Sequence, residues 1–176
     1  MACAARPVLI SKSAIVPAGT DLSGQWQLRI EPGSRPPGGD EQGIRIPPPT
    51  SSRNRGREAP RNPRGSRSSA VSVFLESGDA LKITQTASGL FISFDRAIVE
   101  EYRFGENRLV SVGPIEAQRV SGWQEGRFVT QTLDEAGAVL TETWELLAGG
   151  KVLVRKISLA AGDEERFSSE QYFDRL

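Results

Sequence analysis

Alternation of apolar and polar residues recurs from Val71 to the C-terminus, and it constrains the fold of this chain more than any other feature. Leu81 and Ile83 alternate with polar neighbours, and after a Ser-Gly turn the same pattern returns over residues 90–94. A period of two places successive side chains on opposite faces of a strand. Similar runs, separated by short Gly-containing turns and beginning with a strand over residues 71–76, continue to the end. Residues 71–176 therefore predict an all-β, antiparallel up-and-down meander.

An earlier strand is predicted over residues 21–31, where Trp26, Leu28 and Ile30 alternate with polar residues. Gly24 carries no side chain, so another backbone or a ring can approach it closely. With this segment included, we expect about nine or ten strands. The sheet should close into a barrel, because closure removes exposed strand edges. The indole of Trp26 is predicted to plug one end.

Two parts of the chain resemble known proteins. Leu-Ser-Gly-x-Trp at residues 22–26 resembles the first motif of lipocalins and of small lipocalin-like envelope lipoproteins of bacteria. Trp123, Phe128-Val129-Thr130, residues 141–146 and residues 149–154 resemble the second group. This resemblance implies a lipocalin-like β-barrel that binds a small apolar ligand or a protein partner. It also implies the bacterial periplasm, with outer-membrane anchoring as an option, while a cytoplasmic location stays open.

Residues 1–20 are short, contain two prolines and are predicted to form a flexible tether. Ala2-Cys3-Ala4-Ala5 resembles the point at which bacterial lipoproteins are cut and acylated, which implies a lipid on Cys3 and membrane association through the N-terminus. The alternative is an ordinary free cysteine near a disordered terminus.

Residues 32–70 differ from the rest in composition, being rich in Pro, Gly, Ser and Arg. Eight arginines and three acidic residues give this stretch a net charge of +5, whereas residues 71–176 carry −6. Such a composition cannot offset the entropy cost of ordering, so the sequence predicts a mobile insertion. A contact with a polyanion or a protein partner is the functional alternative, through Arg53, Arg55, Arg57, Arg61, Arg64 and Arg67. Nucleic acid is an unlikely polyanion here, since no aromatic residue is interleaved with these arginines.

The chain has no histidine and one cysteine, which removes the usual general base and zinc ligands. Neighbouring carboxylates such as Glu100 and Glu101 point to opposite faces of a strand, so they do not form a catalytic pair. We therefore predict no catalytic residue, no metal site, no cofactor and a function that is not enzymatic.

Several polar residues occupy positions at which strict alternation predicts a side chain of the hydrophobic core, among them Thr130, Thr132 and Arg119. They indicate either a partly hollow, ligand-carrying interior or a face turned to solvent. If the interior is hollow, the predicted ligand-binding residues are Trp26, Phe94, Arg119, Trp123 and Phe128. A filled interior favours a different class, a structural or assembly subunit that docks through the barrel surface and the Arg-rich stretch.

Overall fold

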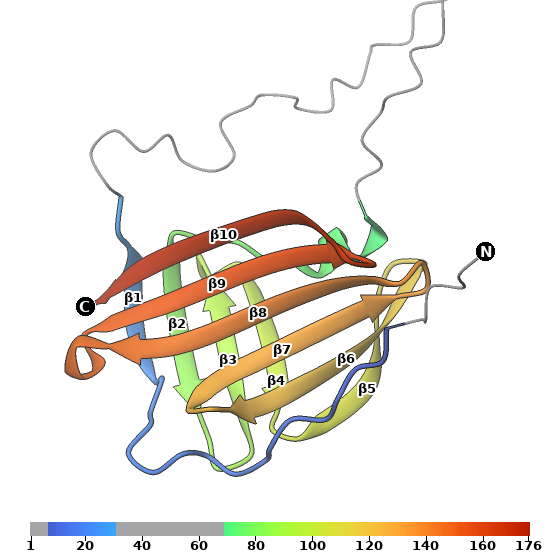
Figure 1. Ribbon diagram of the computed structural model, residues 1–176. Helices are drawn as coiled ribbons and strands as arrows, with labels where there is room; N and C mark the ends of the chain where they lie inside the picture. Colours follow the sequence, from blue (N-terminus) through green and yellow to red (C-terminus); the bar gives the residue numbers. More distant parts are fainter. Residues whose placement is uncertain (1–6, 31–68) are drawn as a thin grey trace, which may run out of the picture. The chain divides into compact units, whose positions relative to one another are not determined.

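The computed structural model describes residues 7–30 and 69–176, which form an antiparallel β-barrel (Figure 1). Short turns join most of the ten strands, and two short 3₁₀ segments accompany them. In chain order the elements are β1 Gly24–Leu28, η1 Ala70–Phe74, β2 Ala80–Gln85, β3 Gly89–Phe94, β4 Ile98–Arg103, β5 Glu106–Val112, β6 Ile115–Gln124, β7 Arg127–Asp134, β8 Ala138–Leu147, η2 Ala148–Gly150, β9 Val152–Ala161 and β10 Glu164–Arg175.

All ten strands belong to one sheet in the order β4-β3-β2-β1-β10-β9-β8-β7-β6-β5. The first strand is held between β2 and the last strand, and Trp26 lies opposite Leu81 on one side and Arg175 on the other. This pairing joins the first strand of the chain to the last. The predicted all-β meander of nine or ten strands is confirmed, and the barrel is nearly closed.

The barrel stays open along one seam, because β4 and β5 follow each other in sequence but lie at opposite ends of the sheet. Side chains bridge part of the seam. The Arg108 guanidinium donates to the Glu101 carbonyl oxygen at 3.1 Å, and the Ser121 hydroxyl donates to the Arg103 carbonyl oxygen at 2.7 Å.

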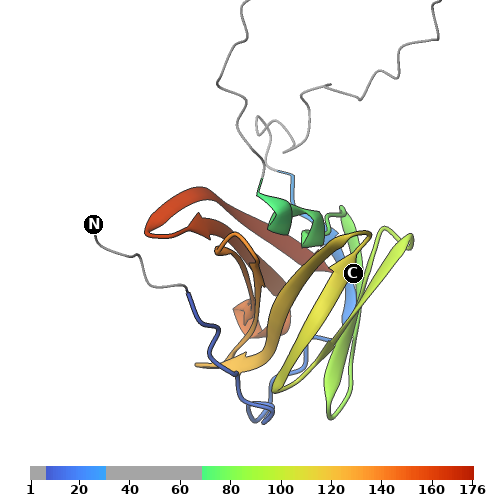
Figure 2. The same cartoon turned by 90° about the vertical axis from the view of Figure 1, so that its right-hand side faces the viewer.

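The strand predicted over residues 71–76 is wrong, because Ala70–Phe74 forms the 3₁₀ segment η1. Val71 and Phe74 are its buried residues, and their spacing of three matches one 3₁₀ turn rather than a strand. The Asp134 carboxylate accepts hydrogen bonds from the Val71 amide at 3.2 Å and the Ser69 hydroxyl at 3.1 Å. These bonds hold η1 against β7, at one end of the barrel (Figure 2).

Aromatic side chains pack the other part of the interior. Phe128 lies at its centre and meets Tyr102, Phe104 and Trp123 edge-on, with ring centres 5.7–5.8 Å apart. Such edge-to-face contacts add to the free energy gained from burying the rings. The charged residues described next lie between this cluster and η1.

Candidate binding site inside the barrel

An ion pair lies inside the barrel wall where β8 and β9 run side by side. Glu142 alternates with Leu140 and Trp144 on the inward face of β8, and Arg155 lies opposite Trp144 on β9. Arg155 Nε donates to Glu142 Oε2 at 2.9 Å, and the two side chains are only 1% and 4% exposed. Burying two charges this deeply costs desolvation free energy that their attraction does not always recover, so stability alone does not explain the pair.

The remaining donors of Arg155 are also engaged. Its guanidinium donates to the Glu76 carbonyl oxygen at 2.7 Å and to Gln171 Oε1 at 3.4 Å. Its Cζ lies 4.7 Å from the centre of the Trp144 ring and 5.2 Å from that of Phe94. Arg155 therefore stands where the charged and aromatic parts of the interior meet.

A second ion pair lies nearer the seam. Arg119 donates from Nη1 to Glu100 Oε2 at 3.0 Å and from Nε to Thr132 Oγ1 at 3.2 Å. The Arg119 guanidinium lies 5.4 Å from the Tyr102 ring and 5.7 Å from the Phe74 ring of η1. It thus contacts both the interior and the 3₁₀ segment that covers it.

Burial raises the pKa of the Tyr102 hydroxyl well above its ordinary value, and the carboxylates of Glu142 and Glu100 raise it further. Burial also raises the pKa of Glu76, with the same two carboxylates adding to the rise and Arg155 opposing it. Titratable groups with perturbed pKa values that gather in one place are typical of functional sites.

Two indole donors inside the barrel complete the site. Among the described residues, Nε1 of Trp123 and Nε1 of Trp144 are buried and have no hydrogen-bond acceptor. The third tryptophan differs, since Trp26 Nε1 donates to the Leu22 carbonyl oxygen at 3.1 Å. An unsatisfied buried donor is unusual enough to point toward an acceptor supplied from elsewhere.

The structure brings the five predicted ligand-binding residues into the interior. Four of them share one apolar cluster and are at most 3% exposed: Trp26, Phe94, Trp123 and Phe128. Arg119 is buried too, and its aromatic neighbours are Tyr102 and Phe74. Cys3 and the arginines at 53, 55, 57, 61, 64 and 67 lie outside the described residues, so their predicted roles stay predictions.

Sequence reasoning missed Glu76, Glu142 and Arg155. The signal for two of them was present, because Glu142 and Arg155 each interrupt an otherwise apolar row of alternate residues. Thr130 and Thr132 are buried and face inward, as a polar interior requires. By contrast, Thr141 and Thr143 lie on the opposite face from Glu142, on the outside of the barrel.

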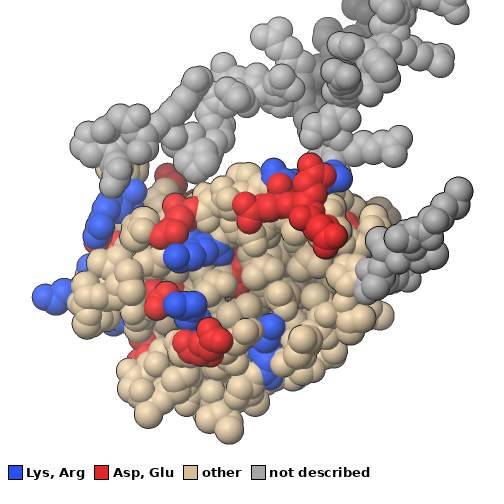
Figure 3. Space-filling view, viewed as in Figure 1, with Lys and Arg blue, Asp and Glu red and all other residues tan. Residues whose placement is uncertain are grey.

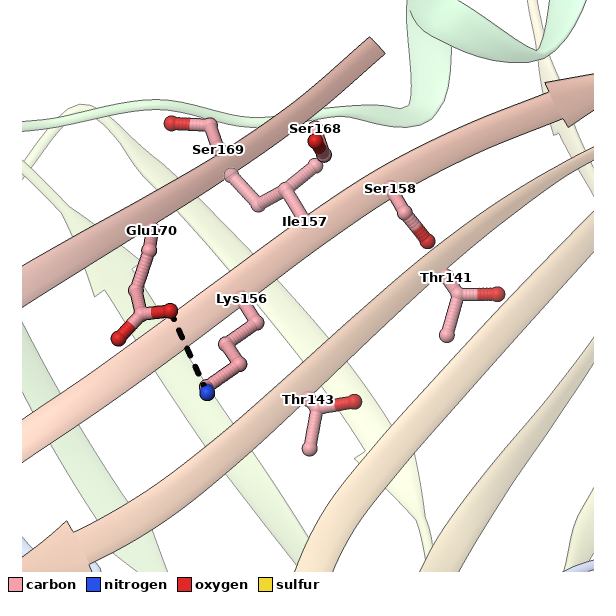
Figure 4. Close-up of a pocket in the computed structure, with 8 residues that line it drawn as sticks. All are labelled: Thr141, Thr143, Lys156, Ile157, Ser158, Ser168, Ser169 and Glu170. Carbon is pink, nitrogen blue, oxygen red and sulfur yellow. Dashed lines mark ion pairs between the residues drawn. The ribbon is translucent and has the colours of Figure 1, made fainter. Parts of the chain in front are cut away.

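That outer face carries a shallow hollow of about 400 Å³ over β8, β9 and β10 (Figure 4). Thr141, Thr143 and Ser158 line it, and Lys156 Nζ reaches across to Glu170 Oε2 at 3.3 Å. The ion pair is half exposed, as expected for a solvated sheet face. Within residues 7–30 and 69–176 no acidic, His or Cys cluster could hold a metal ion, and no helix is long and apolar enough to cross a membrane.

No protein-family model matches this sequence, and no curated protein matches it. Among solved structures, a luciferase domain of the dinoflagellate Lingulodinium polyedrum is similar over 98% of this chain, with 14% identity and a TM-score of 0.55. The chain spans 46% of that structure's length. A secretory abundant heat soluble protein of Ramazzottius varieornatus is similar over 55% of this chain and 70% of its own, with 12% identity and a TM-score of 0.42. The luciferase domain shows that the fold is a lipocalin-like barrel.

Proposed function

We propose that this chain is a non-enzymatic, lipocalin-like binding protein whose barrel interior takes a small, largely apolar molecule carrying a hydrogen-bond acceptor. One observation carries the proposal: the buried Trp144 indole has an N–H donor without an acceptor, and the guanidinium carbon of Arg155 lies 4.7 Å from the centre of its ring. An apolar ligand body would contact the aromatic cluster, and its acceptor would satisfy this donor.

Charge balance supports a neutral acceptor over a strongly charged one. The two inward arginines, Arg119 and Arg155, are already paired with Glu100 and Glu142. A full charge brought into this compensated interior would lack a partner, which is costly at low dielectric. A carbonyl, ether or hydroxyl oxygen fits the unpaired indole donor without that cost.

Access to the interior requires a movable element, and η1 is the best candidate. It is five residues long, and its Phe74 ring covers Arg119. The hydrogen bonds that Ser69 and Val71 donate to the Asp134 carboxylate hold its start in place. So short a segment gains little stability from its own hydrogen bonds, so its packing decides whether it stays in place.

The function is proposed as non-enzymatic because the inward carboxylates Glu100 and Glu142 are each neutralised by an arginine and the sequence offers no histidine. The proposed location is the bacterial envelope, with Cys3 as the acylated residue. Support for this part comes from the resemblance of Ala2-Cys3-Ala4-Ala5 to a lipoprotein cleavage site.

A structural or assembly subunit is the second candidate. It is favoured by the edge-on contacts among Phe128, Phe104 and Trp123, whose ring centres lie 5.4–5.8 Å apart and leave no ligand-sized space between those rings. In this second candidate the filled barrel takes no ligand and docks onto a partner through its outer surface.

The test compares two naphthalene probes of similar size. 2-Acetylnaphthalene carries a carbonyl acceptor and 2-isopropylnaphthalene does not. We expect 2-acetylnaphthalene to bind with one-to-one stoichiometry by native mass spectrometry and to quench tryptophan fluorescence. Trp144→Phe should weaken the binding of 2-acetylnaphthalene about tenfold, as expected for losing one buried hydrogen bond, and leave that of 2-isopropylnaphthalene unaffected. Equal affinities for both probes, or no binding of either, would favour the docking subunit.

A further inference from the structure

The segment ahead of the first strand crosses the outside of the barrel as a strap, defined here as residues 7–16 (blue in Figure 1). Ser13 forms a two-bond bridge with Trp123 on β6, with N···O distances of 3.0 and 2.8 Å. Gly122 makes this close approach feasible, since a Cβ there would lie 2.5 Å from the Ser13 carbonyl oxygen. The strap is therefore a fixed part of the barrel's outer surface.

The strap buries one side and exposes aliphatic side chains on the other. Leu9 is 8% exposed, whereas its neighbours Val8 and Ile10 are 82% and 75% exposed. Leu109 on β5 is 74% exposed and lines the same surface hollow of about 520 Å³ as Pro7 and Val8. In Figure 3 the surface below the beginning of the strap is mainly uncharged, whereas acidic side chains gather above it. We call Val8, Ile10 and Leu109 the strap patch.

The closeness of the strap patch to Cys3 in the sequence indicates which kind of surface it contacts. Three residues separate Cys3 from Pro7, where the strap begins. Even a fully extended chain of that length spans only about 14 Å. A lipid on Cys3 would therefore keep Pro7, where the strap begins, within about 14 Å of the acylated residue. Large aliphatic side chains that close to a bilayer gain free energy by entering the headgroup boundary.

We propose that the strap patch is a membrane-contacting surface that sets the orientation of the barrel on a phospholipid bilayer. The inference rests on the proposed acylation of Cys3 and adds which face of the barrel touches the lipid. Glu116 and Glu135 also line the hollow beside Val8. Their charges disfavour anionic headgroups, so the fitting surface is zwitterionic.

A tryptophan added to the patch reports the contact. Leu109→Trp places an indole in the strap patch, and Ser168→Trp, on the exposed outer face of β10, is the matched control. The full-length protein is anchored through Cys3 to phosphatidylcholine vesicles that contain brominated lipid, either by its native acyl chains or by coupling the thiol to a maleimide lipid. We expect the added emission of Leu109→Trp to be blue-shifted and quenched, and that of Ser168→Trp to be unchanged.

The outcomes separate this inference from the proposed anchoring. Equal quenching at both positions, or none at either, overturns the strap patch as the contacting face. Mass spectrometry of the native N-terminus decides acylation independently, because the maleimide-coupled protein tests the face in either case. Adding Val8→Glu/Ile10→Glu should abolish the difference in quenching between Leu109→Trp and Ser168→Trp. Adding the matched pair Thr141→Glu/Thr143→Glu should leave that difference unchanged. If Val8→Glu/Ile10→Glu leaves the quenching intact, the patch does not meet the membrane.

Discussion

The guanidinium carbon of Arg175 lies 4.4 Å from the centre of the Trp26 ring. The two residues are opposite each other in the pairing of β1 with β10, so this contact joins the first strand of the barrel to the last. Gly24 lies beside the ring, and its φ of +153° is a backbone conformation that residues with a side chain rarely adopt. The indole is fully buried between these groups.

Arg175→Ala should destabilise the protein, since it removes both the cation–π contact and the aliphatic part of the side chain that covers Trp26. We expect a loss of about 0.5–1 kcal/mol in the free energy of unfolding, the usual worth of such a contact at an exposed site. Urea denaturation followed by tryptophan fluorescence measures it. Arg29→Ala is the control, because Arg29 forms a half-exposed ion pair with Asp174 and should cost less. Equal losses for both variants would mean that the ring contact contributes nothing specific.

The sequence predicted the barrel because alternation survives in nearly every strand, and residues 81–94 show why. Leu81, Ile83, Leu90, Ile92 and Phe94 are all buried and lie on two paired strands, as the period of two requires. Alternation does not distinguish a strand from a 3₁₀ turn where a segment is short and has apolar residues in succession. Val71, Val73 and Phe74 fit a strand about as well as a 3₁₀ turn, and only packing against β7 and β8 decides between them.

The site was predicted only in part, because it depends on strand register. Alternation places Phe94, Trp123 and Phe128 inside, so their gathering followed from the fold. The pairing of Arg155 with Glu142 follows from the register between β8 and β9, in which Trp144 lies opposite Arg155. A turn one residue longer would change that register, and sequence alone does not fix it.

Removing one partner of the interior ion pair should be far more damaging than removing both. Arg155→Met leaves Glu142 buried without its cation, and we expect a loss of about 3–5 kcal/mol in the free energy of unfolding. Arg155→Met/Glu142→Leu removes both charges at similar volume and should recover most of that loss. Thermal and urea denaturation of the two variants provide the measurement.

A surface pair serves as the comparison for this prediction. Arg127 and Glu145 also lie on neighbouring strands, with Arg127 Nε 3.0 Å from Glu145 Oε2, but their side chains are 46% and 31% exposed. Arg127→Met should cost at most about 1 kcal/mol. If Arg155→Met proves equally mild, the interior pair is accessible to water and its burial has no energetic consequence.

Gly122→Ala should release the strap from the barrel. The added Cβ would lie 2.5 Å from the Ser13 carbonyl oxygen, so the strap or β6 has to move. Hydrogen exchange should accelerate at the amides of Ser13 and Trp123, which form the bridge. Gly126→Ala is the matched control: its φ of +80° adds backbone strain but nothing lies within 4 Å of the new Cβ. Equal protection of the two bridge amides in both variants would show that the strap does not depend on Gly122.

Ionisation of the Glu76 carboxyl should lower the free energy of unfolding as pH rises. Burial and the nearby carboxylates raise its pKa in the folded protein above the ordinary 4.5, so the folded state binds this proton more tightly than the unfolded chain does. The resulting stabilisation is fully present below pH 4.5 and is lost as pH rises through the raised pKa of Glu76. The surface groups Asp21, Glu170 and Asp174 have lowered pKa values and act in the opposite sense, losing their stabilisation as pH falls.

Glu76→Gln isolates this contribution, because an amide does not titrate and the backbone carbonyl that accepts from Arg155 remains. We expect the variant to be more stable than the parent protein near pH 7 and to lose that advantage toward pH 4, as measured by urea denaturation across this range. The opposite sign, with the parent protein gaining stability over Glu76→Gln as pH rises, would mean that the carboxylate is held by Arg155 or Arg119 more strongly than burial opposes it. In that case the loop after η1 would be anchored by charge, and access to the interior would require an ion pair to break.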